Sequence, residues 1–309
     1  MKLFTLIHIY KGTKNHSIEE IEGLKKKVRP YLLCAIQLHH SLRLANIQLS
    51  IITNDKEFLK QLTIIDQSLD LVELEFTLEV PEEIKFYSAH YKIETYKYLS
   101  TLKDQYVGLV DSDITCINNK NRALLNIIAQ KLPLYYDITD QMVPAFGIDR
   151  IINDKQKISG NPSIGLWAGG EFLSGTPSFF DELYKTIDET KKNYFAHYRS
   201  LFHEGDEMLT SIAIEEMLSR GYPVYDAGNL GVITRYWSIN TRHPQKPFNA
   251  FKKCLLLHLP ADKKFLSLLA EDYDHRSVLQ KYIKHLWKKK PRRIASKLLA
   301  ISKFMSNKR

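Results

Sequence analysis

The chain has 309 residues, with 44 lysine and arginine residues against 35 aspartate and glutamate residues, a formal net charge of +9. Residues 281–309 hold eleven of the basic residues and no acidic one, which leaves 33 basic and 35 acidic residues in residues 1–280. A near-neutral body with a basic tail argues against a nucleic-acid-binding domain, whose basic residues would lie across its folded face, so no nucleic-acid partner is expected.

The composition also excludes several other classes of protein. Hydrophobic residues make up 44% of the chain and charged residues 26%, which is typical of a folded globular protein. The three cysteines are far apart and form no Cys-x-x-Cys pair, so we expect a reducing compartment and neither a disulfide framework nor a zinc knuckle. The apolar N-terminus is short and contains His8, which favours a buried first strand over a signal peptide. Because no run of 18 apolar residues occurs, no membrane-spanning segment is predicted.

In the first part of the chain, apolar strands alternate with helical patterns. Strands are expected at residues 3–9, 47–53, 71–76 and 106–110. A capping box at Ser17 begins a helical pattern that we expect Pro30 to divide, and a further helix is expected at residues 87–102. This alternation predicts an α/β domain with a largely parallel sheet.

The rest of the body continues with shorter elements. The patterns predict strands at residues 133–136, 223–225, 231–235 and 254–257, and helices at residues 177–191 and 206–220. No clear boundary interrupts residues 1–265, which we interpret as one domain followed by a helical, basic extension at residues 266–309.

The strand at residues 106–110 ends in Asp111-Ser112-Asp113. Side chains at positions i and i+2 of an extended chain point to the same side, so the two carboxylates can converge on one cation. Carboxylate ligands suit Mg²⁺ or Mn²⁺. An ordinary turn after a strand is the alternative explanation.

A second apolar strand ends in a polar cluster that contains His258, Lys263 and Lys264. His258 can complete a metal site with Asp111 and Asp113, and either lysine can neutralise phosphate charge. The alternative is a histidine that caps a strand beside two surface lysines. The two clusters occur at strand ends, where open α/β sheets bind ligands, and this favours the functional interpretation.

With these motifs the sequence resembles the GT-A fold glycosyltransferases that use nucleotide sugars, in particular the bacterial family 8 enzymes of cell-surface glycans. Asp111-Ser112-Asp113 matches their Asp-x-Asp motif, and the segment from His258 to Lys264 resembles their His-x-x-Gly-x-x-Lys signature, with Ala261 in place of glycine. The resemblance implies a GT-A-like, Rossmann-like mixed sheet flanked by helices. It also implies metal binding by His258, diphosphate binding by Lys264 and an approach of Lys92 to the nucleotide sugar.

The resemblance implies further site residues in two groups. The donor-binding candidates are Ile9, Tyr10, Lys11, Asp55, Lys92, Ser112, Gly170, Lys263 and Lys264, although Tyr10 also fits a structural strand end and Asp55 a helix cap. The paired glycines at 169–170 allow close backbone approach to a ligand, and Glu171 would then hold sugar hydroxyls, unless this segment is only a turn. Asp206 and Glu207 are the best candidates for catalytic carboxylates.

These observations predict a metal-dependent glycosyltransferase that moves a sugar from a nucleotide donor, a UDP-sugar, to a glycan or glycolipid acceptor such as lipopolysaccharide or capsule. The cofactor would be Mn²⁺ or Mg²⁺, and the resemblance favours a hexosyltransferase that retains the anomeric configuration. The alternatives are a nucleotidyltransferase and a non-catalytic membrane or nucleic-acid-binding protein that acts through its basic tail.

The tail suggests where the enzyme works. After Pro291, residues 294, 298, 301 and 305 would share the apolar face of a helix, with basic residues on other faces and Trp287 before it. Such a helix would bind an anionic membrane surface, which predicts a peripheral protein on the cytoplasmic face of the inner membrane. The alternatives are a disordered tail and a helix docked on the body or on a second subunit.

Overall fold

A seven-stranded mixed sheet forms the centre of the structure, a computed structural model that describes residues 1–10, 18–62, 68–103, 105–118, 121–270, 273–274 and 276–289. Its strand order is β3-β2-β1-β4-β7-β6-β8, in which β7 runs antiparallel to both neighbours and the other pairs are parallel. The strands are β1 (Lys2–Ile7), β2 (Gln48–Thr53), β3 (Asp70–Glu73), β4 (Val107–Val110), β6 (Leu134–Asp137), β7 (Ala168–Gly175) and β8 (Tyr225–Asp226).

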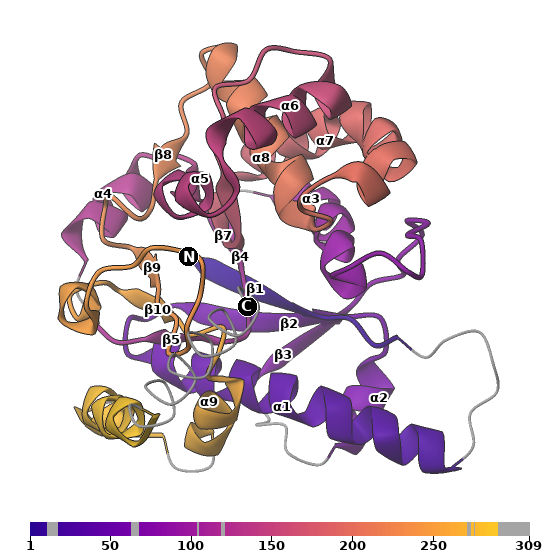
Figure 1. Cartoon of the computed structure of the whole chain (residues 1–309). Coiled ribbons are helices and arrows are strands. Elements are labelled where there is room, and N and C mark those ends of the chain that lie inside the picture. The colour runs from indigo at the N-terminus through magenta and orange to yellow at the C-terminus, as the bar shows by residue number, and fades with distance from the viewer. Residues whose placement is uncertain are drawn as a thin grey trace, which may run out of the picture.

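A second, three-stranded sheet lies beside the first (Figure 1). It consists of β5 (Ile114–Cys116), β10 (Leu256–His258) and β9 (Ile233–Arg235), in the order β5-β10-β9. Only three residues of chain, 111–113, separate β4 of the large sheet from β5 of the small one. The end of β4 is thereby held beside the small sheet.

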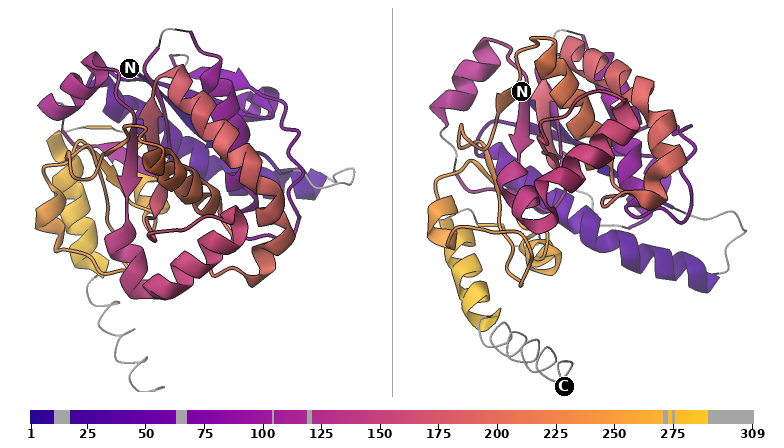
Figure 2. Two further views of the ribbon diagram at one scale, coloured as in Figure 1. Left: turned by 90° about the horizontal axis from the view of Figure 1, so that it is seen from above. Right: turned by 45° about the horizontal axis from the view of Figure 1, so that its top comes forward.

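Helices cover the two faces of the large sheet (Figures 1 and 2). On one face, α1 (Ile18–Arg43) packs on β1 and β2 and against α9 (Lys263–Leu269). On the other, α3 (Lys92–Ser100), α7 (Pro177–His197) and α8 (Asp206–Ser219) pack on β4 and β7. The remaining helices are α2 (Lys56–Gln61), η1 (Tyr87–Tyr91), α4 (Arg122–Ala129), α5 (Thr139–Phe146), α6 (Ile148–Ser159), η2 (Tyr198–Ser200), η3 (Phe248–Phe251) and the helix at residues 276–289.

The predicted α/β architecture with a mixed sheet is confirmed. The predicted break at Pro30 is wrong, because α1 continues through it. Pro30 lacks the amide that would bond to the carbonyl of Lys26, but Lys26 is exposed, so water can satisfy that carbonyl. The buried face of α1, with Leu32, Leu38 and Leu42 fully buried, supplies the packing that keeps the helix continuous.

The glycine pair at 169–170 lies inside the buried strand β7, so the interpretation as a turn is wrong. A Cβ atom at Gly169 would lie 2.2 Å from the Glu171 carboxylate, and one at Gly170 would lie 2.9 Å from that of Asp206. A larger residue at either position would therefore displace a buried charged side chain, because these side chains pack directly against the strand.

The C-terminal part of the described chain is a helix that packs on the body. Tyr282 is 1% exposed and belongs to a small apolar cluster under the second sheet, whereas Trp287 is 75% exposed. The predicted amphipathic helix after Pro291 lies outside the described residues. The division at residue 265 stays a prediction, and α9 spans that residue. Within the described ranges, no helix combines the length and apolarity needed to cross a membrane.

Stability is expected to depend on His90, a buried residue of η1. Its ring contacts the Tyr194 hydroxyl at 2.8 Å and the Phe86 carbonyl at 3.2 Å, and burial lowers its pKa to about 4. As the pH falls below about 6.5, the pKa of His90 in the unfolded chain, the unfolded chain binds a proton at His90 and the folded chain does not. The folded state therefore loses stability between about pH 6.5 and about pH 4.

We therefore expect wild-type protein to lose about 2 kcal/mol more stability than His90→Gln between pH 7.5 and pH 5. Urea unfolding of both proteins at the two pH values measures this difference. Equal losses would show that His90 titrates in the folded state as it does in the unfolded state.

Candidate active site

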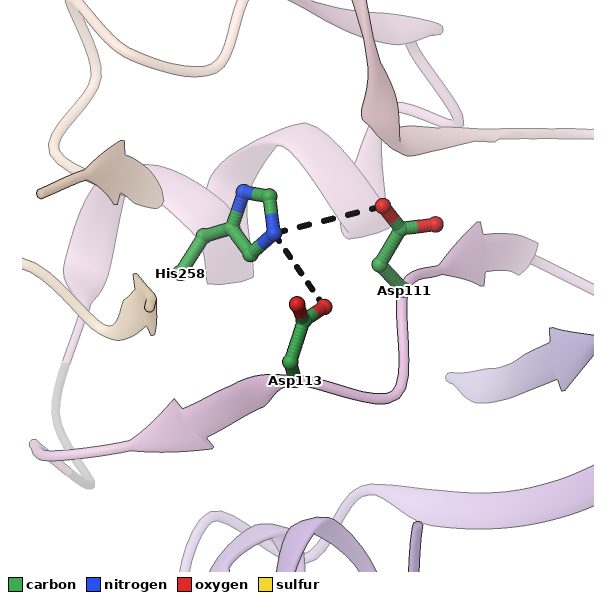
Figure 3. Close-up of side chains that lie close together, drawn as sticks. All are labelled: Asp111, Asp113 and His258. Carbon is green, nitrogen blue, oxygen red and sulfur yellow. Dashed lines mark hydrogen bonds and ion pairs between the residues drawn. The ribbon is translucent and has the colours of Figure 1, made fainter. Parts of the chain in front are cut away.

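The site forms where the chain crosses from the large sheet to the small one. Asp111 follows the last residue of β4, and Asp113 precedes the first residue of β5. In the antiparallel pairing of β5 with β10, Ile114 lies opposite His258, so the register brings His258 beside Asp113. Figure 3 shows the three side chains, which come from two sheets and point toward one another. The predicted convergence of Asp111, Asp113 and His258 is present.

The geometry of these three residues fits a divalent cation. Their ligand atoms lie within 4.8 Å of one another, with His258 Nε2 3.2 Å from Asp113 Oδ1 and 4.0 Å from Asp111 Oδ2. Asp113 and His258 are buried, whereas the Asp111 side chain is 31% exposed, so the site is open on one side. Two carboxylates and an imidazole form a donor set that suits Mn²⁺ and accommodates Mg²⁺.

Glu171 holds the His258 ring from behind. The Glu171 carboxylate contacts His258 Nδ1 at 3.1 Å, on the opposite side of the ring from Asp113. This contact is the carboxylate–histidine arrangement that fixes the ring of a metal ligand and directs its other nitrogen to the metal. Burial alone would lower the pKa of His258, but Asp113 and Glu171 outweigh burial and raise it to about 9. Cation binding must therefore displace a proton from His258.

Arg235, at the end of β9, compensates the charge of Glu171. Its guanidinium makes two contacts of 2.6 Å to the Glu171 carboxylate and a third of 3.1 Å to Glu207. Burial raises the pKa of a carboxyl group, but Arg235 outweighs this effect and holds the pKa of Glu171 well below its usual range. Sequence reasoning missed Arg235, although it is the last residue of a strand that was predicted at residues 231–235.

Lys92, the first residue of α3, links three parts of the site. Its ammonium lies 2.8 Å from Asp111 Oδ1, 3.4 Å from Asp206 Oδ2 and 2.8 Å from the carbonyl of Gly170. Burial raises the pKa of the Asp206 carboxyl to about 7, an effect that Lys92 partly offsets. The paired glycines were predicted to let a ligand approach the backbone closely, and in the structure it is the Lys92 side chain that approaches the Gly170 carbonyl.

Asp206 and Glu207 begin α8, where the helix dipole favours negative charge. The Glu207 carboxylate accepts from Trp167 Nε1 at 3.0 Å and from the Gly170 amide at 3.1 Å, besides its pair with Arg235. Both Glu207 and Glu171 are thus fully engaged by protein groups. Asp206 differs, because its buried Oδ2 makes no hydrogen bond within the described residues beyond the 3.4 Å ion pair with Lys92.

The two lysines of the His258 segment differ in position. Lys263 forms an ion pair with Asp113 and lies with its ammonium 5.7 Å above the Tyr31 ring. Lys264 is exposed on α9, and it does not line either of the two clefts beside Asp111 and Asp113. The lysine that faces the site is therefore Lys263, one position before the lysine that the family signature matches.

The candidates near the first strands have mixed environments. Tyr10 is 44% exposed and packs edge-on against Tyr87, whereas the Ile9 backbone is bound on both sides by the Asn54 side chain. Asp55 caps α2 by accepting from the Phe58 amide at 2.8 Å, as one of its two predicted roles requires. Lys11 lies outside the described residues.

Two clefts meet at Asp111 and Asp113. The first, of about 570 Å³, runs from Asp111, Ser112, Asp113 and Lys263 to an aromatic wall of His8, Tyr10, Tyr31 and Tyr87. The second, of about 380 Å³, is lined by Asp206, Glu207, Arg235 and His258 and by the rings of Phe86, Phe146, Trp237 and His243. Their shared residues are Phe86, Ala89, Lys92, Asp111, Asp113 and Lys263.

The fold has counterparts among solved structures. The galactosyltransferase LgtC, solved with donor and acceptor sugar analogues, superposes with a TM-score of 0.52 and 10% identity over 88% of this chain and 95% of its own. The bifunctional glycosyltransferase WbbM superposes with a TM-score of 0.52 and 11% identity over 91% of this chain, which spans half of the WbbM chain. This chain has the GT-A-like fold of these glycosyltransferases. No protein-family model matches the sequence, and no curated protein matches it.

Removing Arg235 is expected to unfold the site rather than only to alter it. Arg235→Met takes the guanidinium away from two buried carboxylates, Glu171 and Glu207, and leaves Glu171 with His258 as its remaining charged contact, which should lower the free energy of unfolding by about 3–5 kcal/mol. Arg220, whose side chain is half exposed and pairs with the exposed Glu182 and Glu189 as well as with Glu216, is a control for the loss of a solvent-exposed guanidinium, and Arg220→Met should cost less than about 1 kcal/mol.

Urea unfolding of both variants measures these costs. Adding Glu171→Gln to Arg235→Met removes the Glu171 charge and should restore part of the loss. Equal stability of the two single variants would contradict the buried ion pair.

Proposed function

We propose that this protein is a cation-dependent glycosyltransferase that moves a sugar from a UDP-sugar to a cell-surface glycan such as lipopolysaccharide or capsule. The observation that carries the proposal is the convergence of Asp111, Asp113 and His258 at the junction of two clefts. The convergence lies at the carboxyl ends of β4 and β10, in a fold shared with glycosyltransferases. Carboxyl ends of strands are where open α/β sheets bind their ligands.

The first cleft is proposed to hold the nucleotide. Its aromatic wall offers Tyr10, exposed at the cleft, as a face on which a base can stack. At the other end Lys263 and Lys92 face the metal-binding carboxylates, so a diphosphate placed there would meet two ammonium groups. A base at one end and a diphosphate at the other is the arrangement that a nucleotide sugar requires.

The charges of the site support a bound cation. Asp111, Asp113, Glu171 and Glu207 carry four negative charges before Asp206 is counted, against three positive charges on Lys92, Arg235 and Lys263 and a fourth on protonated His258. A cation that displaces the His258 proton replaces this fourth positive charge. Mn²⁺ or Mg²⁺ would stabilise the negative charge that develops on the departing diphosphate. In this scheme Asp111, Asp113 and His258 hold the cation, Glu171 orients His258, and Lys263 neutralises phosphate charge.

The second cleft is proposed to hold the transferred sugar and the acceptor. Two buried polar atoms of its lining residues lack a hydrogen-bond partner, the acceptor Asp206 Oδ2 and the donor Trp237 Nε1. A sugar hydroxyl both donates and accepts, so hydroxyl groups can satisfy both atoms. The cations of this cleft are already paired with carboxylates, which favours a neutral acceptor sugar over an acidic one.

The stereochemical outcome is the finer part of the proposal. Glu207 is engaged by Arg235, Trp167 and the Gly170 amide, so it is a poor base for deprotonating an acceptor. Retention of anomeric configuration, which the family resemblance favours, needs no such base. The anomeric configuration of the product, read from its proton NMR coupling constants, decides between retention and inversion.

Removing one metal ligand should abolish most of the activity. Asp113→Asn and Asp111→Asn are each expected to lower UDP release from a UDP-sugar panel with Mn²⁺ by about 10²–10³, because charge stabilisation of the leaving group is lost. Asp149→Asn, on the exposed side of α6, removes the same charge away from the clefts and should leave the rate unchanged.

The products of this assay separate the competing functions. A nucleotidyltransferase would instead release pyrophosphate from a nucleoside triphosphate and a sugar phosphate. Unchanged UDP release in both aspartate variants would refute the metal site. The same assay with neutral and acidic oligosaccharides tests the class of acceptor.

We also propose that the basic C-terminus places the enzyme on the cytoplasmic face of the inner membrane. The supporting observation is that Lys284, Trp287 and Lys288 are exposed on the helix that leads into the basic residues 290–309. Each basic group near an anionic leaflet contributes about 1 kcal/mol, and an exposed tryptophan favours the interfacial layer.

Vesicle flotation tests this anchor. The full chain is expected to float with phosphatidylglycerol vesicles, to float far less with phosphatidylcholine vesicles and to be released by high salt. A chain that ends at residue 289 keeps the docked helix and should lose most of the binding. Equal flotation of the two chains would show that residues 290–309 do not anchor the protein.

A further inference from the structure

The carboxylate of Asp262 is contacted almost entirely by the C-terminal helix. Asp262 lies in the turn between β10 and α9, immediately before Lys263, and its side chain is fully buried. It accepts a hydrogen bond from the Tyr282 hydroxyl at 2.8 Å, contacts His285 Nε2 at 2.8 Å and pairs with the Lys289 ammonium. These three residues follow a helical spacing and share one face of the helix.

Asp262 makes these contacts instead of a local one. It occupies the N-cap position of α9, yet its side chain makes no capping hydrogen bond. An aspartate at this position ordinarily accepts from an amide of the first turn, which stabilises the helix by about 1 kcal/mol. The Asp262 carboxylate therefore contacts the helix at residues 276–289 and does not cap α9.

The same helix also reaches the loop after β9. The Lys289 ammonium contacts Ser238 Oγ at 2.7 Å, and the Tyr282 ring packs against Phe248 and Phe265. Ser238 follows Trp237, which lines the second cleft, and Asp262 precedes Lys263, which lines both clefts. One helix thus contacts Ser238 and Asp262, and the residue beside each of them in the sequence, Trp237 or Lys263, lines a cleft.

We propose that the helix at residues 276–289 is a positioning element of the donor site, which sets the place of Lys263 by holding Asp262. The proposal rests on the function proposed above. Lys263 is the first residue of α9, so the path of the turn at Asp262 determines where its ammonium lies relative to Asp113. Asp111 and Asp113 belong to another segment, and His258, although it precedes this turn, is held by the pairing of β10 with β5 and by Glu171. Loss of the contact should therefore weaken diphosphate binding more than the chemical step.

The helix offers a matched pair of lysines for the test. Lys289 is bound to Asp262, whereas Lys288 is exposed, so Lys289→Met and Lys288→Met remove the same charge from adjacent positions. Calorimetric titration of the full chain with UDP and Mn²⁺ should show about tenfold weaker UDP binding in Lys289→Met, because a charged contact that positions Lys263 is lost. Lys288→Met should bind like wild type. Tyr282→Phe, which keeps the packed ring, should lose about threefold.

Kinetics and hydrogen exchange separate positioning from mere support. The KM for the UDP-sugar should rise in Lys289→Met with little change in kcat, and Lys289→Arg should recover most of the loss. Without any ligand, amides of residues 259–266 should exchange faster in Lys289→Met than in Lys288→Met.

Each possible failure has a different meaning. If wild-type protein binds no UDP in the presence of Mn²⁺, the proposed function itself is wrong and this inference falls with it. If wild type binds UDP and Lys289→Met binds it equally well, the helix only supports the fold. Unchanged exchange at residues 259–266 would likewise overturn the coupling between Lys289 and the turn.

Discussion

The passage of the chain from one sheet to another between Val110 and Ile114 is the constraint on which the site depends. Three residues are too few to form an independent loop, so the end of β4 and the start of β5 fix Asp111 and Asp113 in space. The register of β5 with β10 then places His258 opposite Ile114, the residue after Asp113, and this brings the His258 ring beside the Asp113 carboxylate. A carboxylate pair and an imidazole meet because of strand pairing, before any side-chain contact is considered.

Burial makes the surrounding charges interdependent. Glu171 is buried between His258 and Arg235, and Arg235 also contacts Glu207, so removing Glu171 takes a charged contact from both His258 and Arg235. Unpaired charge in a low-dielectric interior is costly, so these groups must stay close to one another. Gly169 and Gly170 leave the space beside the strand that the Glu171 and Asp206 carboxylates occupy. The same burial strengthens every electrostatic contact to a ligand at the open side of Asp111.

Sequence reasoning found what local patterns encode. Asp111, Asp113 and His258 were predictable because polar residues directly follow apolar strands, and the cap at Asp55 was predictable because capping is local. Arg235 was not, since its partners are 28 and 64 residues away in the chain. Likewise, whether Lys263 or Lys264 faces the site depends on the first turn of α9, which a one-residue choice in a motif cannot specify. The continuation of α1 through Pro30 reflects burial against the sheet, which outweighs a local preference.

The two clefts have a common wall made of Lys92, Asp111, Asp113 and Lys263, together with Phe86 and Ala89. A ligand in either cleft therefore alters the charge and position of groups that the other cleft presents. The two spaces are thermodynamically linked, and linkage is reciprocal: the factor by which one ligand changes the affinity of the second equals the factor by which the second changes that of the first. The coupling between a ligand in one cleft and a ligand in the other is thus a property of this shared wall rather than of either cleft alone.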